Sequence, residues 1–584
     1  MSKKYKNLIF FFIIFIVFFL GILTERFDVD KKISKNLETF TDRIYQFVYS
    51  ITNKEKKVYI HIEPRHYQKI LSIRDLSINK TMLTKDLEDW VPARINLRNN
   101  TKDIKIKVWF DNLVRKSPDT KETNELLYLI KDWIPDDKIS KKNNPNIKIR
   151  LKGVWPDHWT DDKQWSFKIK FINEEDQIFN LSRLALQPPE TLDYIYEWLL
   201  SKAFENENLI SLPVSFTEVI INNKSRGLYT AHGQISEKIL KKNKRPLSPI
   251  IGFSKDTWIK EQINSKRLLG LGATDSLNGL EDTFLRSKIE TVRFDKFKND
   301  PTQVAYLKKA IYLLESFRNG EKKTSEVFDI KKLAKVMALR ALIGSSEFDY
   351  LDTKFYYNFN TSLLEPISKE AHVRLNLNWK EKYYSWWIDS TKIRTHYTGN
   401  KNIFIDLLYK DKKFYEEYLK QLNIYSSNNF YNELIKNNKK EFENNLLILK
   451  SNFPTKKIFS YEHLIIMEKR VQDLLSPIEG LNAYFEKFSK GIVKIKVQNI
   501  QRLPLEITGL RFADGTEIKK ENSMLIDGKQ PLQPAKIYTF EVDCKNSSNC
   551  DKNFIQNQKV LYNILGQTSE RLVMIQPFYY SNKK

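Results

Sequence analysis

Two short runs of alternating apolar and basic residues carry the side chains best suited to bind phosphate. Residues 147–153 (IKIRLKG) and 165–171 (WSFKIKF) alternate in this way, and their basic positions are Lys148, Arg150, Lys152, Lys168 and Lys170. Successive side chains of a β-strand point to opposite faces, so each run predicts a strand with one apolar and one basic face. Paired as a hairpin, the two strands would line one side of a sheet with cations that attract phosphate. An ordinary half-exposed sheet with its lysines in solvent fits the same pattern.

The motifs of several common enzyme classes are absent from the sequence. It contains no GxSxG, HExxH, CxxC or GxxxxGK[ST], and no two histidines lie four residues apart with a carboxylate between them. Serine hydrolases with a nucleophile elbow, zincins and P-loop proteins are therefore disfavoured. Two cysteines also exclude a disulfide framework, a four-cysteine zinc site and an iron–sulfur cluster.

The composition is that of a folded, basic protein. The chain has 584 residues, 41% hydrophobic and 13% aromatic, and its 97 Lys and Arg exceed its 72 Asp and Glu by 25. Disordered chains lack so many apolar residues, and multi-pass membrane proteins lack the 29% of charged residues found here. The cations are spread along the chain rather than gathered in one segment, so no nucleic-acid partner is predicted.

An apolar segment near the N-terminus predicts a membrane anchor. Residues 8–23 (LIFFFIIFIVFFLGIL) carry no charge and follow Lys3, Lys4 and Lys6. Either a signal-peptide core or a short anchor fits this length. No small-x-small cleavage site follows, which favours an uncleaved signal-anchor. The positive-inside rule then predicts a single-pass membrane protein with a cytoplasmic N-terminus and its bulk outside the cytoplasm, in the periplasm or at the cell surface.

Changes of periodicity divide the rest of the chain into an α+β region, a helical region and a β-rich end. In order, the predicted segments are 1–25, the signal-anchor; 26–55, a juxtamembrane helix or stalk; 56–290, an α+β region with an insertion at 114–146; 291–488, a helical lobe with an acidic cluster; and 489–584, an all-β sandwich-like module. Cys544 and Cys550 flank the turn-like KNSSN in this module, where either a local disulfide or two free thiols is consistent with the sequence.

Seven sequence blocks, in order, resemble the CotH kinase family, the atypical kinases named for spore-coat protein H. The blocks lie between about residues 56 and 480, and they read IKIRLKG, WPDHW, KQWSFKIKF, FNLSRLALQPPETLDYIYEWLLSKAF, VIINNKSRGLY, SPIIGFSKDTW and DTKFYYNFNTSLLEPI. The resemblance implies a protein-kinase-like fold of two lobes, with ATP and Mg as cofactors. It also implies phosphoryl transfer to a protein hydroxyl, on an envelope or surface protein if the bulk lies outside the cytoplasm.

The resemblance also implies roles for individual residues. Kinase chemistry needs cations on the phosphates, a carboxylate near the attacking hydroxyl and oxygen ligands for magnesium. By position in the blocks, these are Arg150, Lys152 and Lys168 for the nucleotide, Glu347 as the catalytic residue with Asp349 as a substitute base, and Asp352 and Glu370 for the metal.

Three departures from the family pattern leave two functions open. Glu347 and Glu370 stand where the family has Asp, and His232-Gly233 stands where many relatives have Glu-Glu. A side chain longer by one methylene misplaces a catalytic group, and an error near 1 Å costs on the order of 10²-fold in rate. The alternatives are an active phosphotransferase and a non-catalytic pseudokinase that serves as a scaffold or binding protein. A third reading, a glycan-binding surface, rests on aromatic residues at 383–387.

Overall fold

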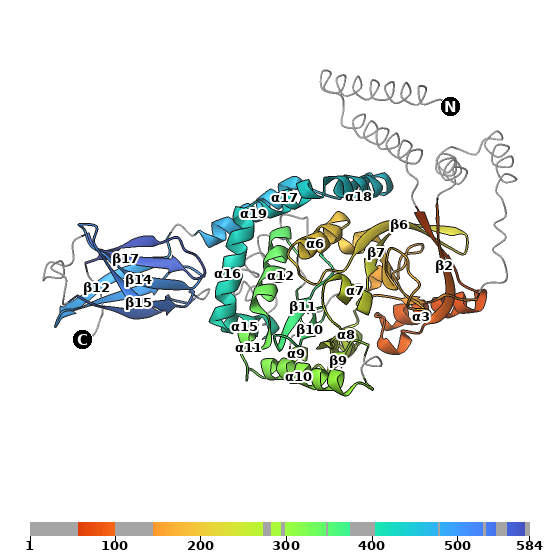
Figure 1. Ribbon diagram of the computed structural model, residues 1–584, viewed down its shortest axis with the longest axis horizontal. Helices are drawn as coiled ribbons and strands as arrows, with labels where there is room; N and C mark the ends of the chain where they lie inside the picture. Colours follow the sequence, from red (N-terminus) through yellow and green to blue (C-terminus); the bar gives the residue numbers. More distant parts are fainter. Residues whose placement is uncertain are drawn as a thin grey trace, which may run out of the picture.

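The computed structural model describes residues 56–99, 144–271, 282–293, 298–345, 348–373, 403–476, 479–529, 533–544 and 557–577. Figure 1 shows an elongated molecule, with a β module at one end of the long axis, helices in the middle and a β-barrel at the other end. The predicted stalk at 26–55, most of the insertion at 114–146 and the aromatic residues at 383–387 lie outside the described residues.

The N-terminal part folds into a closed barrel of seven strands in the order β1-β2-β3-β4-β5-β7-β6. Its strands are β1 (Lys56–His61), β2 (Val91–Asn99), β3 (Ile147–Leu151), β4 (Phe167–Phe171), β5 (Arg183–Gln187), β6 (Val214–Ile221) and β7 (Lys224–Gly233). The predicted hairpin is confirmed: β3 and β4 pair antiparallel, with Ile149 opposite Ile169 and Arg150 opposite Lys168. Because the apolar faces of both strands fill the barrel core, their basic faces lie on the outside.

A second, four-stranded sheet has the order β11-β10-β8-β9. Its strands are β8 (Ile250–Phe253), β9 (Ile289–Thr291), β10 (Lys354–Asn358) and β11 (Leu363–Ile367). All three pairings are antiparallel, so the end of β8, the start of β10 and the end of β11 lie at one edge of the sheet. The predicted domain boundary at residue 290 therefore runs through this sheet, because strand pairing joins segments that are distant in sequence.

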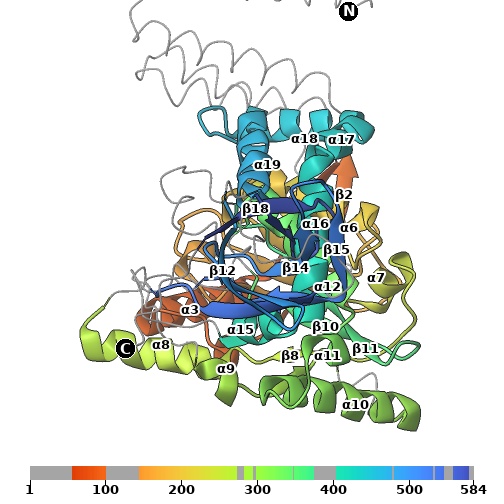
Figure 2. The same cartoon turned by 90° about the vertical axis from the view of Figure 1, so that its left-hand side faces the viewer.

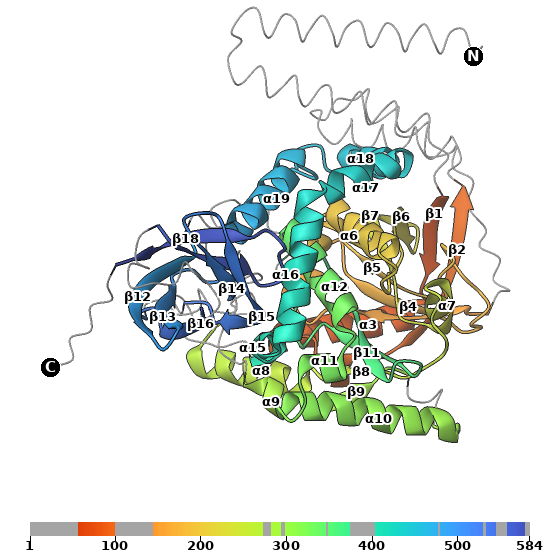
Figure 3. The ribbon, with the colours of Figure 1, turned by 60° about the vertical axis from the view of Figure 1, so that its left-hand side comes forward.

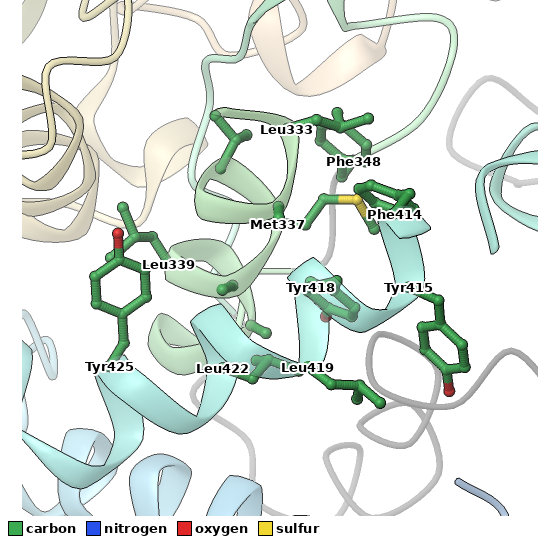
Figure 4. Packing of buried hydrophobic residues seen from close by; sticks show 14 of the residues in the cluster. Leu333, Met337, Leu339, Phe348, Phe414, Tyr415, Tyr418, Leu419, Leu422 and Tyr425 are labelled. Atoms are coloured by element: carbon green, nitrogen blue, oxygen red, sulfur yellow. The ribbon is translucent and has the colours of Figure 1, made fainter. Parts of the chain in front are cut away.

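Helices surround the second sheet and separate the barrel from the β module (Figure 3). The described α-helices are α3 (Pro64–Lys80), α6 (Ile195–Asn206), α7 (Glu237–Lys242), α8 (Asp256–Leu269), α9 (Thr283–Arg286), α10 (Pro301–Arg318), α11 (Thr324–Val327), α12 (Ile330–Ile343), α15 (Ile403–Lys410), α16 (Lys412–Ser427), α17 (Phe430–Asn437), α18 (Lys439–Asn452) and α19 (Tyr461–Leu475). Of these, α3 packs on the barrel strands β2 and β3. The central helix α12 is apolar on nearly all sides and packs against α16, where Met337 lies beside Phe414 and Tyr418 (Figure 4). Such burial on every side fits a helix in the middle of a large core.

The C-terminal module is one seven-stranded sheet in the order β15-β14-β17-β18-β12-β13-β16, seen end-on in Figure 2. Its strands are β12 (Leu481–Ser489), β13 (Ile492–Asn499), β14 (Leu505–Arg511), β15 (Glu517–Ile526), β16 (Ile537–Asp543), β17 (Lys559–Ile564) and β18 (Arg571–Gln576). Its edge strands β15 and β16 contact each other, so the sheet curls around its core instead of forming two separate layers. The module begins at Leu481, before the predicted start at 489. Cys544 is disulfide-bonded, and Cys550 lies outside the described residues.

The finding on membrane spans corrects the predicted topology. In the part of the chain that the structure describes, no helix is both long and apolar enough to cross a membrane. The predicted anchor at 8–23 lies outside the described residues. The described part of the chain has an α+β fold with barrel-like sheets. The finding on membrane spans stands against the predicted N-terminal transmembrane helix and against the single-pass localisation that depends on it.

A glycine contact at the junction of the β module with the helices gives a first prediction. Gly566 has φ +77°, and a Cβ there would lie 2.5 Å from the carbonyl oxygen of Glu416 in α16. We expect Gly566→Ala to lower the free energy of unfolding by about 1–2 kcal/mol through its left-handed backbone and by about 1–3 kcal/mol more through the clash. Gly515→Ala is the matched control, because Gly515 has φ +89° with nothing within 4 Å. Equal losses in urea denaturation of the two variants would contradict the expected contact.

Candidate functional site

Charged side chains gather where one edge of the four-stranded sheet meets the basic face of the barrel. Lys255 follows β8, Asp349 and Asp352 precede β10, and Lys369 and Glu370 follow β11. Since these strand ends share one edge, antiparallel pairing alone brings the five residues together. Lys152, which follows β3, reaches them from the barrel. These six residues are called the lysine–carboxylate cluster below.

Two carboxylates of the cluster are held by lysines. The Nζ atoms of Lys152 and Lys369 lie 3.1 and 2.8 Å from Oε1 of Glu370. The Nζ atom of Lys255 lies 2.5 Å from Oδ1 of Asp352. The two pairs form one electrostatic unit, because the charge of Glu370 acts on the pKa values of both Asp352 and Lys255.

The carboxylates of these pairs are ionised. Burial would raise the pKa of Glu370, but Lys152 and Lys369 hold it well below its ordinary range. Burial would likewise raise the pKa of Asp352, but Lys255 and Lys369 lower it. Opposite charges at such short distances favour the charged form of each partner.

The lysines around these carboxylates have different proton affinities. Burial lowers the pKa of Lys152, although Glu370 opposes the shift. Burial and the neighbouring Arg150 lower the pKa of Lys168 to about 7. Burial would lower the pKa of Lys255, but Asp352, Glu370 and Asp349 together raise it. An anion bound beside Lys168 would raise the pKa of this lysine and so favour its protonated form.

Asp349 differs from the paired carboxylates. Its Oδ1 accepts hydrogen bonds from the backbone N–H groups of Leu351 and Asp352, at 2.8 and 2.9 Å. Burial, and then the charge of Asp352, raise its pKa from 3.8 to about 6. A carboxylate with this pKa exchanges a proton near neutral pH, as a general base must.

Arg150 belongs to a neighbouring group of cations on the barrel surface. Its Nη1 lies 2.6 Å from Oε1 of Glu88, and its guanidinium lies 5.1 Å from the ring centre of Trp90. Lys170 lies 4.4 Å from the centre of the same ring. The predicted nucleotide-binding cations are thus divided: Lys152 belongs to the cluster, whereas Arg150 is directed to Glu88 and Trp90.

The loop that carries Glu370 is held from two sides. The fully buried Arg340 of α12 donates hydrogen bonds to Ser368 Oγ and to the carbonyl oxygens of Lys369 and Glu370. The carboxylate of Glu197, in α6, accepts from the backbone N–H groups of Glu370 and Ala371. This loop needs support, because Glu370 has φ +62° and His372 has φ +41°, a left-handed backbone that costs a non-glycine residue about 1–2 kcal/mol.

His232 takes part in the same support. Its Nε2 lies 2.9 Å from Oε1 of Glu197, and both side chains are buried. The sequence suggested that a carboxylate was missing where His232-Gly233 replaces Glu-Glu. In the structure the buried carboxylate comes from α6, and it contacts this histidine and the loop backbone. Burial would raise the pKa of Glu197, but the hydrogen bond with His232 lowers it.

Most of the predicted site residues are electrostatically linked. Lys152, Asp349, Asp352 and Glu370 belong to the cluster, and the charges of Lys152 and Lys369 act on the pKa of Lys168. Glu347 lies outside the described residues. Sequence reasoning did not select Lys255, Lys369, Glu197 or Arg340. Lys255 lies within the block SPIIGFSKDTW, so it could have been found, whereas nothing local in sequence marks Arg340.

The described side chains alone do not make a metal centre. Mg²⁺ is held by oxygen ligands at 2.0–2.1 Å in near-octahedral geometry. Within the described ranges, no group of three or more His, Cys, Asp or Glu side chains is placed to hold a metal ion. Asp352 and Glu370, the predicted ligands, are each paired with lysine instead.

Comparisons with known proteins do not identify the chain. No family model matches it. A search of curated proteins finds no significant match either. The resemblance to CotH kinases therefore stays a prediction.

Proposed function

We propose that the lysine–carboxylate cluster binds the phosphates of a nucleoside triphosphate and supports transfer of the terminal phosphoryl group to a hydroxyl. The observation that carries this proposal is the meeting of Lys152, Lys255 and Lys369 from three separate segments beside a carboxylate whose pKa is about 6. Phosphoryl transfer depends mainly on positioning and charge stabilisation, and this arrangement can supply both.

Each part of the cluster has a role in the proposed reaction. The lysines neutralise the negative charge on the phosphates, and Lys168, with its pKa of about 7, gains a proton as the anion binds. The hydroxyl oxygen attacks the terminal phosphorus as the bond to the bridging oxygen breaks, and the diphosphate leaves. Asp349 accepts the proton of the attacking hydroxyl. By the resemblance, the acceptor is a protein hydroxyl.

A second candidate is a non-catalytic protein that binds anions through the same cluster. The ion pairs favour it: Asp352 and Glu370 are neutralised by lysines and are not grouped with further ligands in the described part of the chain. Such a protein would bind a nucleotide without transferring a phosphoryl group. Both candidates bind a nucleotide, and only the first transfers a phosphoryl group.

Nucleotide-dependent stabilisation tests binding directly. We expect millimolar ATP to raise the Tm of the full-length protein, because a ligand at about 100 times its Kd adds ~2.7 kcal/mol to the stability of the folded state. Lys152→Met should remove most of the shift while Glu370 keeps its contact with Lys369. Lys224→Met, at an exposed lysine of β7, is the matched control and should keep the shift.

The outcomes separate the two candidates. A shift that Lys152→Met abolishes, together with transfer of labelled γ-phosphate to the chain or to water, supports the phosphotransferase. The same shift without transfer supports the non-catalytic protein. No shift with any nucleoside triphosphate would refute both.

A further inference from the structure

A basic cleft lies at the junction between the helices and the β module. It has a volume of about 220 Å³, and it is bounded by the end of α15 and the start of α16 on one side and by loops of the β module on the other. Its basic side chains are Lys410, Lys412, Arg502, Lys529 and Lys536. Asp527 is the one acidic residue among the described residues that line it.

The charges around this junction cleft are unbalanced. Five cationic residues and one acidic residue line it, and in the described part of the chain none of the four lysines forms an ion pair with an acidic side chain. Like charges gathered at one site repel one another, so an anion placed among them gains attraction to several at once. The cleft therefore favours a ligand with more than one negative charge.

The wall that carries Arg502 and Lys529 is fixed before any ligand binds. The amide of the buried Asn499 donates to the carbonyl oxygens of Leu503 and Asp527, at 2.8 and 3.1 Å. The backbone N–H of Lys529 donates to the carbonyl oxygen of Gln501 at 2.7 Å. Gly528 packs so closely that a Cβ would lie 1.7 Å from the carbonyl oxygen of Arg502. Because the two loops are locked together, binding costs little ordering of the backbone.

Tyrosines add apolar and hydrogen-bonding surface to the junction cleft. Tyr409 and Tyr415 have ring centres 4.9 Å apart and are mostly buried, so they present limited parts of their rings. Burial, and then the charge of Asp527, raise the pKa of Tyr538, so its hydroxyl stays protonated and polar. Exposed parts of aromatic rings and a polar hydroxyl beside cations suit a small hydroxylated ligand that carries acidic groups.

We propose that the junction cleft binds a sugar phosphate or sugar carboxylate, a small hydroxylated molecule with one or more acidic groups. The volume of about 220 Å³ lies below the about 300–1,000 Å³ of pockets for drug-sized ligands, so it suits a smaller molecule. The ligand would contact both the helices and the β module and so would link the two. This site is separate from the lysine–carboxylate cluster, and the proposal does not depend on the proposed phosphoryl transfer.

Calorimetric titration of the full-length protein tests the proposal with four probes: fructose 1,6-bisphosphate, glucuronate, neutral fructose and inorganic phosphate. We expect the first two to bind and fructose not to bind, and we expect the affinity to fall as salt is added. The double variant R502A/K529A should weaken binding about tenfold or more, because it removes two charged contacts. The matched control K440A/K450A removes two exposed lysines of α18 and should leave binding unchanged.

The remaining outcomes also decide the question. Equal binding by R502A/K529A and the wild type would overturn the proposal, as would no binding of either sugar anion at millimolar concentration. Phosphate binding alone would overturn the sugar component and assign the cleft to simple anions. Lys152→Met should not alter these affinities, so failure here is distinguishable from failure of the proposed function.

Discussion

Replacing Arg340 with methionine is expected to lower the free energy of unfolding by about 3 kcal/mol. The guanidinium is fully buried and donates at 2.9, 3.2 and 2.8 Å to one hydroxyl and two carbonyl oxygens of the loop at 368–370. Methionine fills much of the same volume but leaves these three acceptors without their donor, at a cost of about 1–3 kcal/mol each. Relief of burying a guanidinium offsets part of that cost.

The same variant should also affect ligand binding, because the loop it releases carries Glu370. Without Arg340, residues with positive φ can relax to an ordinary backbone conformation, which moves Glu370 relative to Lys152. Urea denaturation measures the stability, and the ATP-dependent change in Tm measures the site. Arg65→Met is the control, since the Arg65 side chain is 78% exposed and its loss should change stability by less than about 0.5 kcal/mol. A similarly small change in Arg340→Met would contradict the role assigned to the loop.

Local periodicity was sufficient to predict the β3–β4 hairpin. A period of two fixes which residues share a face, so the apolar core of the barrel and its basic outer face both follow from IKIRLKG and WSFKIKF. The helical lobe predicted at 291–488 contains the helices from α10 to α19, and the strands β10 and β11 also lie within it. The period does not indicate which strands pair with one another. For that reason the predicted domain boundary at residue 290 divides the sheet in which β8 pairs with β10.

The partners of the site residues could not be predicted, because they are set by packing between distant segments. Lys152 and Glu370 are 218 positions apart in the sequence. Glu197 lies 173 positions from Glu370, whose backbone N–H donates a hydrogen bond to it. His232 illustrates the point: as a departure from a family motif it suggested a missing carboxylate, whereas the fold supplies one from α6. Residue types at the site were therefore more predictable than their pairings.

Asp349→Asn is expected to reduce phosphoryl transfer by about 10²–10⁴-fold, the usual contribution of a general base. The amide oxygen can still accept from the backbone N–H groups of Leu351 and Asp352, so the local fold is kept. With a pKa of about 6, wild-type Asp349 is protonated below that pH, so kcat/KM should fall toward acid with a limb near pH 6. The variant should lose this limb. Asp473→Asn, at an exposed position of α19, should keep both the rate and the limb.

Stability separates a catalytic role of Asp349 from a structural one. The pKa of this group is raised in the folded state, from 3.8 to about 6, so the folded state binds its proton more tightly than the unfolded state does. Between about pH 4 and pH 6 the wild type therefore loses stability as the pH rises, and at pH 7 the full penalty is present. Asparagine carries no charge and removes this penalty. At pH 7 the variant should be at least as stable as the wild type while its transfer rate falls; a parallel loss of stability and activity would show that Asp349 acts only through the fold.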